Sequence, residues 1–375
     1  MNFTIDLTDQ QLLLLLQENP MISFKKLGEA LEINPVTVQR RLNALHLKNI
    51  VTGVQGFPKY AKLGLEHSFF LLQIQSVENM AKIEKFCDEH PYTRFRNRIF
   101  GTVNGQFVQF TSPIGTKDKI KESIEILVQK SIIERVITSY KPLSTISSTL
   151  KAQYWDIQTM QTDFQFSNWF RELEEMPPTD EEFPLNEYFT PDLEFLDVII
   201  LRELTRNARR STVDLYRDIR KNQEYTLETP LTEYQVRKHR KKVEEKFIRN
   251  YRVGYNRRNF GLLNYLLYSG TLELVEMKKL YFLLPSIPFP SQLTLVERNP
   301  EKARYLWWIN LPPLQTGSLT NYLFERSTEF QFMMFYGETS ALYFLWHENW
   351  DQKQQKWKES REWMVTDPLK RIGIL

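Results

Sequence analysis

Apolar residues near the start of the chain recur with the spacing of a helix in three short segments, 8–18, 24–31 and 35–46. Ser23 and Asn34 stand directly before the second and third segments. In these positions a side-chain oxygen can accept a hydrogen bond from a free backbone N–H group. The pattern therefore predicts three helices with short connections between them.

The third segment combines an apolar face with a polar one. Val38, Leu42 and Leu45 lie three or four residues apart and form the apolar face, while Pro35 suits the first position of a helix. Residues 49–60, "NIVTGVQGFPKY", then have the pattern of a strand, a turn and a second strand. Helices joined by a tight turn and followed by a small hairpin predict a winged helix-turn-helix module.

After residue 63 the pattern changes to the period of two that is typical of strands, interrupted by two amphipathic helices. Asn104 and Gly105 form a favoured pair for a hairpin turn between two of the strands. The order strand, helix, strand, strand, helix, strand predicts a ferredoxin-like sheet with both helices on one face. These elements are expected at 68–76, 77–91, 94–101, 106–112, 116–131 and 133–142.

The second half of the chain repeats the first, which we interpret as an internal duplication. At an offset of 188 residues, Asp9, Leu16 and Ser23 correspond to Asp197, Leu204 and Ser211. An insertion at 221–230 then raises the offset to 198. At this offset Val38 and Leu45 correspond to Val236 and Val243. The predicted fold class is α+β, with two winged helix-turn-helix modules in tandem, each followed by a ferredoxin-like βαββαβ domain. An additional strand is expected at 341–349, and the tail at 356–375 has no counterpart.

An acidic, proline-rich stretch separates the two halves. Residues 172–187 hold seven acidic groups and no basic group, so we expect an extended linker or an irregular connection there. The predicted domains are a winged helix-turn-helix at 1–62, a ferredoxin-like domain at 63–150, the linker at 151–190, a second winged helix-turn-helix at 191–260, and a second, divergent ferredoxin-like domain with a C-terminal extension at 261–375.

Composition narrows the class of protein further. No apolar run approaches the ~20 residues that a membrane span needs, and the single cysteine, Cys87, excludes an internal disulfide. We therefore expect a cytoplasmic protein without a membrane partner. The sequence lacks a nucleophile elbow, a phosphate loop, a zinc-protease motif and a dinucleotide fingerprint, and its five histidines are scattered. We accordingly predict no catalytic residues, no metal ligands and no cofactor, and thus a protein that is not an enzyme.

Aromatic residues gather in the last strands of the chain. They include Trp307, Trp308, Phe335, Tyr343 and Trp346. Aromatic sheet faces usually belong to a core or a subunit interface, so we interpret these residues in that way. The alternative is a ligand pocket between the sheets.

The polar face of the third helix and a basic segment in the second half are the candidate DNA contacts. Gln and Arg side chains can pair with adenine and guanine, and other cations contact phosphates. Residues 232–258 hold ten basic and three acidic groups, a local charge of +7 against +3 for the whole chain. The alternative interpretation is a solvated helix face. The candidate DNA-binding residues are Val36, Thr37, Gln39, Arg40, Arg41, Asn43, Lys48, Tyr234, Gln235, Arg237, Lys238, Arg240, Lys241 and Lys242.

This arrangement resembles the leucine-responsive regulator/AsnC family, the feast-famine regulators of bacteria and archaea. Residues 6–51, "DLTDQQLLLLLQENPMISFKKLGEALEINPVTVQRRLNALHLKNIV", are similar to the opening pattern of that family, including Thr-Val-x-Arg-Arg at 37–41. The pair Gly64-Leu65 is similar to the entry of its effector (RAM) domain. Asn49 stands where the family usually has Gly, and the second half lacks the Arg-Arg pair in register.

The resemblance implies a transcription regulator that reads double-stranded DNA, assembles as a homo-oligomer, and responds to a small effector such as an amino acid. Two alternatives stay open. Some relatives of this family keep the same two folds and decarboxylate a modified tetrapyrrole, with His and Arg in a pocket between ferredoxin-like domains; these are the sirohaem decarboxylases. The other alternative is a protein-interaction scaffold without catalytic activity.

Overall fold

The first helix-turn-helix module has the helices and caps that the sequence predicts. The computed structural model describes residues 5–156, 159, 161–185, 187, 189–225 and 230–375. Helices α1 (Leu7–Glu18), α2 (Phe24–Leu31) and α3 (Pro35–Leu47) form this module. The side chains of Ser23 and Asn34 accept hydrogen bonds from the backbone N–H groups of Lys26 and Val36. Asn49 has a φ of 54°, a left-handed conformation that asparagine tolerates, so the departure from the expected glycine causes no break.

The second module repeats the three helices as α7 (Phe195–Arg206), α8 (Thr212–Lys221) and α9 (Glu233–Lys246). Of the predicted insertion at 221–230, residues 226–229 lie outside the described residues. A buried carboxylate contacts the third helix in both modules. Asp9 Oδ1 accepts a hydrogen bond from Arg41 at 2.9 Å, and Asp197 Oδ1 lies 2.7 Å from His239 Nδ1. The corresponding positions therefore have corresponding packing roles, although Arg and His differ chemically.

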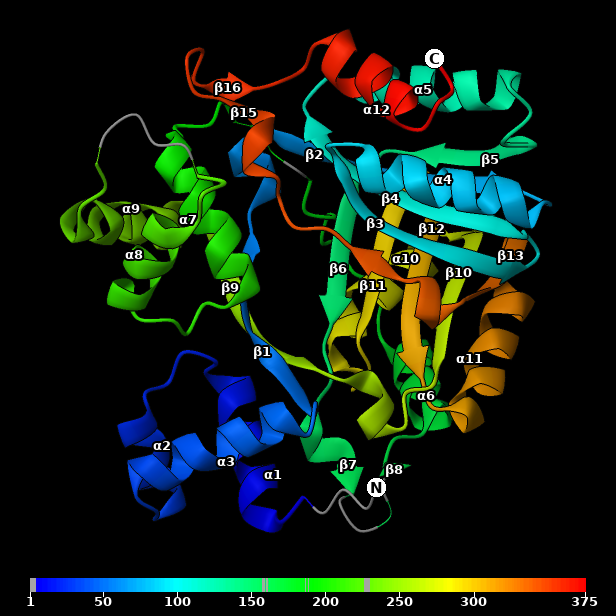
Figure 1. The fold of residues 1–375 in the computed structure, drawn as a ribbon. Helices are drawn as coiled ribbons and strands as arrows, with labels where there is room; N and C mark the ends of the chain where they lie inside the picture. The colour runs from blue at the N-terminus through cyan, green and yellow to red at the C-terminus, as the bar shows by residue number, and fades with distance from the viewer. Residues whose placement is uncertain (1–4, 157–158, 160, 186, 188, 226–229) are drawn as a thin grey trace.

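The strand that follows each module pairs with its counterpart in the other half. Strands β1 (Val51–Pro58) and β9 (Ile248–Tyr255) form a two-stranded antiparallel ribbon of their own. The strand–turn–strand wing expected at 49–60 is therefore not formed, because β1 continues through the predicted turn and finds its hydrogen-bonding partner nearly 200 residues away. We call this element the β1–β9 ribbon. Figure 1 shows it running between the two modules.

The first ferredoxin-like domain has the predicted βαββαβ order. Its elements are β2 (Leu65–Gln73), α4 (Val77–Glu89), β3 (Thr93–Gly101), β4 (Gly105–Pro113), α5 (Lys117–Gln129) and β5 (Arg135–Tyr140). Alternate residues of β2 and β4, such as Phe70 and Phe110, pack against Ile83 of α4 and Ile124 of α5. The period of two thus places one set of side chains under the helices and the other set on the opposite face.

The second ferredoxin-like domain repeats this order and gains a strand from the first half. Its elements are β10 (Asn264–Glu273), α10 (Leu274–Leu283), β11 (Ser291–Arg298), β12 (Lys302–Leu311), α11 (Pro313–Arg326) and β13 (Thr328–Phe335). Strand β6 (Ser144–Ser148) pairs with β11 at the edge. Tyr268 and Trp307 lie in the core with Met277 of α10 and Leu323 of α11.

The two sheets pack through the faces that carry no helix. Phe69 and Phe107 of the first sheet lie in one buried cluster with Leu267, Leu306 and Met333 of the second. Short pairing between β3 and β13 also joins the strands into one continuous order, β5-β2-β4-β3-β13-β10-β12-β11-β6. Figure 1 shows α4 and α5 on the outer side of one sheet and α11 on the outer side of the other. The two halves of the chain therefore form an intramolecular pair.

The predicted linker is partly helical. Short strands β7 (Trp155–Asp156) and β8 (Gln161–Thr162) precede α6 (Phe166–Glu175), which extends into the acidic stretch. Trp169 and Leu173 of α6 are buried in the core of the second ferredoxin-like domain. The prediction of an irregular connection failed over this part, because it weighed the charges and prolines but not the apolar face of the helix.

The C-terminal tail returns to the first half of the chain. Strand β14 (Ala341–Leu342) pairs with β3, so the additional strand expected at 341–349 extends over two residues rather than nine. Strands β15 (Trp350–Asp351) and β16 (Lys356–Trp357) form a small hairpin, and a π-helical turn (Glu362–Thr366) leads into α12 (Asp367–Arg371). Met364 and Leu369 belong to the same buried cluster as the apolar residues of α4 and α5.

Among the described residues, none of the helices has both the length and the apolar character that crossing a bilayer requires.

Candidate nucleic-acid interface

Helix α3 presents a polar face that is exposed to solvent. Val38, Leu42 and Leu45 are buried, as predicted, so the side chains between them point outward. The outward set comprises Val36, Gln39, Arg40, Asn43 and Lys48, all exposed, with Thr37 half-buried. Within the described part of the chain, no hydrogen bond or ion pair holds the side chains of Gln39, Arg40, Asn43 or Lys48. These groups are free to contact a ligand.

Arg41 has a different role from its neighbour Arg40. Its Nη1 atom lies 2.8 Å from Asp6 Oδ2 and 2.9 Å from Asp9 Oδ1, so the guanidinium links α3 to the start of α1. Burial by itself raises the pKa of Asp6, but hydrogen bonds from the Asp9 backbone and from Arg41 outweigh this effect, so the pKa is lowered. Arg41 is thus engaged inside the module.

Helix α9 presents a second exposed basic face. Tyr234 is 75% exposed, and Lys238 and Lys241 are exposed beside it. Arg237 pairs with Glu233 one turn away at 2.8 Å, a surface contact of small strength that a phosphate can replace. Gln235 completes the capping box with Thr232, since its Oε1 accepts from the Thr232 N–H at 2.9 Å.

Two of the predicted contacts on α9 are held inside the second module. Arg240 donates from Nη1 to the Arg210 carbonyl at 2.7 Å and from Nε to Glu244 at 2.9 Å. Lys242 Nζ lies 2.8 Å from the fully buried Asp197. Burial by itself lowers the pKa of Lys242, but the hydrogen bond to Asp197 and the nearby negative charges outweigh this effect, so the pKa is raised. Both side chains therefore stabilise the packing of α9.

The acidic groups around Lys242 do not form a vacant metal site. Glu194, Asp197 and His239 have potential ligand atoms within 4.8 Å of one another. The ammonium group of Lys242 lies among them, 3.5 Å from Glu194 and 2.8 Å from Asp197. A cation of the protein itself already neutralises this cluster. In the first module Arg41, which corresponds to His239, likewise contacts two carboxylates, those of Asp6 and Asp9.

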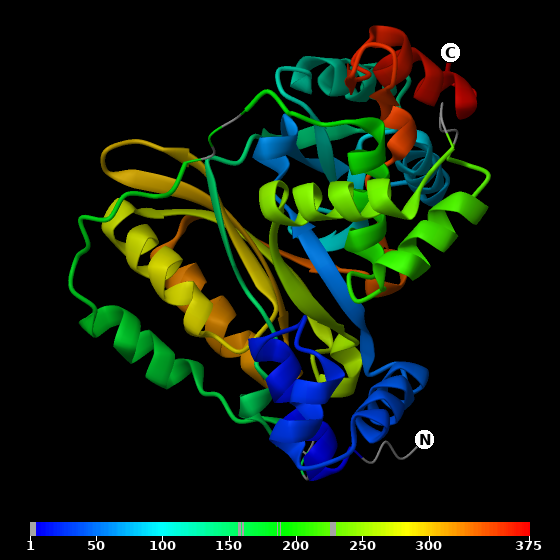
Figure 2. The same cartoon turned by 90° about the vertical axis from the view of Figure 1, so that its left-hand side faces the viewer.

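The two modules are fixed relative to each other. Besides the β1–β9 ribbon, Arg209 of the second module donates to the carbonyls of Pro20 and Ile22 in the first, at 2.7 and 2.8 Å. Its guanidinium lies 4.8 Å from the ring centre of Phe24. Figure 2, which shows the left-hand side of Figure 1, has both modules on the side that faces the viewer. We call this contact the Arg209 clasp; sequence analysis did not find it, because its partners are backbone carbonyls.

The basic segment of the second half divides into two groups in space. Arg237, Lys238 and Lys241 of α9 lie on the exposed face of the module, whereas Arg252 and Arg257 reach the space between the sheets. Arg252 Nη2 donates to Ser147 at 3.1 Å, and Arg257 lies over the rings of Tyr265 and Trp308. The local charge of +7 is therefore not one continuous patch.

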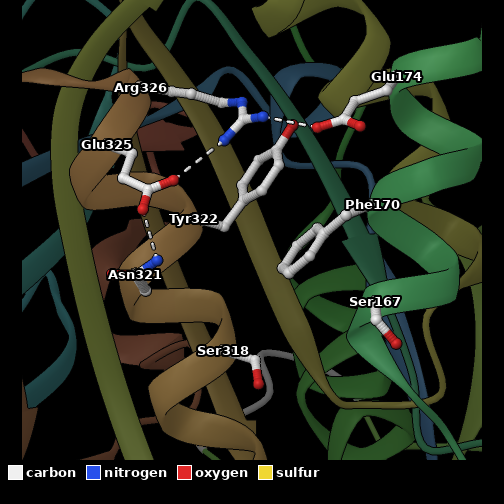
Figure 3. Close-up of a pocket in the computed structure, with 8 residues that line it drawn as sticks. All are labelled: Ser167, Phe170, Glu174, Ser318, Asn321, Tyr322, Glu325 and Arg326. Atoms are coloured by element: carbon white, nitrogen blue, oxygen red, sulfur yellow. Dashed lines mark hydrogen bonds and ion pairs between the residues drawn. The ribbon is translucent and has the colours of Figure 1, made fainter.

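A groove lies between the linker helix and the second ferredoxin-like domain. Its volume is about 360 Å³, and it is lined by Ser167, Phe170, Glu174, Ser318, Asn321, Tyr322, Glu325 and Arg326. Figure 3 shows Phe170 of α6 facing Tyr322 of α11, with Arg326 between Glu174 and Glu325. The two rings stack at 4.0 Å, and Arg326 pairs with Glu174 at 2.6 Å. Because these groups satisfy one another, we interpret the groove as a packing seam.

The aromatic residues of the last strands do not gather in one pocket. Trp307 is buried in the core under the helices, while Phe335 is buried between the sheets. Tyr343 lies at the edge of β3, where its hydroxyl accepts from Arg96 Nε at 2.8 Å. The core interpretation thus agrees with the structure for Trp307 and Phe335.

Comparison with known families identifies the first module. Residues 5–46 match the AsnC-type helix-turn-helix domain. The match covers α1, α2 and almost all of α3, and it includes the outward face described above. No curated protein matches the chain.

The full length of the chain is similar in fold to an enzyme. The crystal structure of the siroheme decarboxylase NirDL matches with a TM-score of 0.51 and 10% identity, over 88% of this chain and 90% of that chain. Its complex with an iron-uroporphyrin III analogue matches with a TM-score of 0.52 and 9% identity, over 88% and 91%. At these identities the likeness concerns the fold alone. An AsnC family transcriptional regulator from Agrobacterium tumefaciens matches over 36% of this chain and 89% of its own, with 18% identity and a TM-score of 0.31.

This likeness overturns the prediction that the chain is not an enzyme. The prediction was wrong because it rested on the absence of local catalytic motifs and on an arrangement taken to be typical of regulators. NirDL has this arrangement and is an enzyme. Side chains from distant strands can form an active site without leaving a short motif in the sequence.

Proposed function

We propose that the chain reads duplex DNA with its two helix-turn-helix modules and regulates transcription. The observation that supports this proposal best is the AsnC-type module, whose third helix has Gln39, Arg40 and Asn43 exposed and without partners in the described chain. Helix-turn-helix proteins place such residues against base edges in the major groove.

The contacts that we propose are fewer than the sequence predicted. In the first module Val36, Thr37, Gln39, Arg40 and Asn43 face the bases, and Lys48 faces the phosphate backbone. In the second module the contacts are Tyr234, Arg237, Lys238 and Lys241. We leave out Arg41, Gln235, Arg240 and Lys242, because each is held by contacts within its own module.

Covalent linkage of the two modules favours simultaneous binding of two half-sites. When one module is bound, the other is held near the same duplex, which raises its effective concentration. The β1–β9 ribbon and the Arg209 clasp keep this spacing constant. We therefore expect a preferred distance between half-sites, and homo-oligomers of the chain stay a prediction.

The test compares the wild type with a Gln39→Ala, Arg40→Ala double variant on a duplex selected from a random pool. Each good base contact is worth about 1–3 kcal/mol, so the double variant should bind at least about tenfold more weakly. Arg171→Ala is the matched control, because Arg171 is also an exposed helical arginine without a partner in the described residues but lies on α6. Equal affinity of the wild type and the double variant would show that α3 does not read the sequence.

A second candidate function follows from the fold of NirDL. Its complex with an iron-uroporphyrin III analogue motivates the proposal that this chain binds and decarboxylates a carboxylated tetrapyrrole. The experiment is to titrate the purified chain with iron-uroporphyrin and to follow the visible absorbance, then to look for loss of CO2 by mass spectrometry. A shifted absorbance band with loss of carboxyl groups would favour this candidate. An unchanged spectrum at saturating protein would exclude it.

A further inference from the structure

Four arginines contact the helix-free faces of the two sheets or place their charges beside them. Arg249 and Arg252 belong to β9, Arg94 to β3, and Arg257 to the short turn before β10. We call them the arginine cluster. Arg249 is exposed and the other three are half-buried. Apart from the total charge of the segment, no feature of the sequence pointed to this grouping, because Arg94 is more than 150 residues from the others.

Arg252 and Arg257 lie over one row of the second sheet. Ser147, Gln292 and Trp308 stand opposite one another on β6, β11 and β12. Arg252 donates to Ser147 at one end of this row, and Arg257 lies 5.8 Å from the ring centre of Trp308 at the other. Neighbouring strands are about 4.8 Å apart, so the row spans roughly 10 Å. Both guanidinium groups are on the face that carries no helix.

The other two arginines, Arg94 and Arg249, place their charges near His67 on the first sheet. His67 is half-buried, with Nδ1 2.8 Å from Thr111 Oγ1, and the ring of Tyr60 packs against it at 4.7 Å. Burial and the charges of Arg94 and Arg249 lower the pKa of His67 to about 3, so the imidazole is neutral near pH 7. Burial and the charge of Arg249 also lower the pKa of Arg252. Cations thus repel one another across this space.

No carboxylate of the described chain neutralises the arginine cluster. Within 4.0 Å, none of the four guanidinium groups has an acidic partner among the described residues. Arg257 donates to Asn310 Oδ1 at 3.1 Å, while the buried Nδ2 of Asn310 has no hydrogen-bond partner there. Partly buried charges and donors without partners are costly, unless a ligand supplies the missing acceptors.

We infer that the arginine cluster binds a small polyanion that bears at least two carboxylate groups. Guanidinium groups bind carboxylates in a bidentate manner, and two arginines at opposite ends of a row that spans roughly 10 Å favour a ligand whose anionic groups are separated. Asn310 and Ser147 supply neutral hydrogen bonds, and Trp308 and Tyr265 supply an apolar floor. A compact polycarboxylate and a carboxylated tetrapyrrole share this chemistry. The inference does not depend on DNA binding.

The test measures the melting temperature of the full chain with citrate and, separately, with uroporphyrin, at an ionic strength matched with sodium chloride. The variant is Arg252→Gln with Arg257→Gln, and the control is Arg171→Gln. We expect at least one probe to raise the melting temperature of the wild type and the control, with at least tenfold weaker binding to the double variant. A ligand that binds the folded state alone raises its stability in this way.

The unliganded double variant supplies an independent readout. It should melt at the same or a higher temperature than the wild type, because its change removes repulsion among cations, whereas a merely structural role would lower the melting temperature. Arg257→Gln alone, which keeps Arg252, should weaken binding less and serves if the double variant does not fold.

Each outcome is decisive. A response to citrate identifies a compact polycarboxylate, and a response to uroporphyrin alone identifies a tetrapyrrole. Equal responses of the wild type and the variants, or no response to either probe, would overturn the inference. Loss of DNA affinity in the double variant with an intact response to the anion would assign these arginines to DNA instead.

Discussion

The adjacent arginines of α3 should have separable effects on DNA binding and on stability. Arg40 is exposed and has no partner in the described chain, whereas Arg41 lies 2.8 Å from Asp6 and 2.9 Å from Asp9. We expect Arg40→Ala to weaken DNA binding without loosening the module. We expect Arg41→Ala to loosen the module and to change DNA affinity little while the module is folded.

The magnitudes follow from exposure. Loss of one base or phosphate contact by Arg40→Ala costs about 1–3 kcal/mol, or about 5- to 150-fold in affinity, while an exposed substitution changes stability by less than about 0.5 kcal/mol. The Asp9 side chain is 12% exposed and loses a charged partner in Arg41→Ala. Hydrogen bonds to charged groups contribute about 1.5–3 kcal/mol. Because the Asp6 contact is exposed, we expect a total loss of about 1–2 kcal/mol.

Two measurements separate the effects. Amide hydrogen exchange of residues 7–47 reports local opening of the module, and Arg41→Ala should accelerate it by about 5- to 30-fold, the equivalent of about 1–2 kcal/mol. Fluorescence anisotropy with the selected duplex reports affinity, and Arg40→Ala should reduce it. The reasoning is refuted if Arg41→Ala weakens DNA binding as much as Arg40→Ala does while its exchange rates stay at those of the wild type.

Three further predictions concern other parts of the fold. Arg209→Ala removes the clasp between the modules, so we expect the preferred half-site spacing to broaden and binding of a two-site duplex to weaken by about 3- to 10-fold. The affinity for a single half-site should stay unchanged, and binding to duplexes with a series of spacer lengths measures both effects. Burial lowers the pKa of His90 to about 3. Burial, together with the charges of Arg94 and Arg249, lowers the pKa of His67 to about 3 as well. In the unfolded chain both histidines become protonated near pH 6.5. Stability should therefore be complete above pH 6.5 and fall as the pH drops towards 3, and His67→Gln with His90→Gln should flatten the melting temperature between about pH 7 and 5. Deletion of 359–375 removes Met364 and Leu369 from the buried cluster that they share with α4 and α5, so it should increase the binding of a hydrophobic dye and lower the melting temperature. Unchanged dye binding and an unchanged melting temperature would show that the tail does not stabilise this core.

Local chemistry predicted much of the fold. The caps at Ser23 and Asn34 were found from residue type alone, since a capping side chain acts on backbone groups two or three residues away. The βαββαβ orders followed from periodicity, because burial on one face imposes a period of two on strands and of 3.6 on helices. The prediction of a wing at 49–60 was wrong because periodicity describes one strand at a time. Its pattern specified a strand but contained no information about the partner of that strand.

The candidate site divides along the same line. The sequence identified α3 and its apolar face, and hence which residues point outward. It assigned Arg41 to the DNA phosphates, because the partners of Arg41 lie more than 30 residues away at the start of α1. It likewise assigned Arg240 and Lys242 to DNA, although buried acceptors within the module hold them. The absence of catalytic motifs misled for a related reason, since an active site need not be local in sequence.

By itself, the sequence determined the helices, the strands, their order and the apolar faces, because these depend on interactions between residues that are close along the chain. The tertiary structure decided which strands pair, which cations are already neutralised, and that Arg252 and Arg257 lie over one row of the second sheet. Pairing and charge compensation depend on distances in space, and chain folding brings together groups that no sequence spacing relates. The proposed DNA contacts could therefore be predicted in part from the sequence, whereas the proposed anion site could be found only from the tertiary structure.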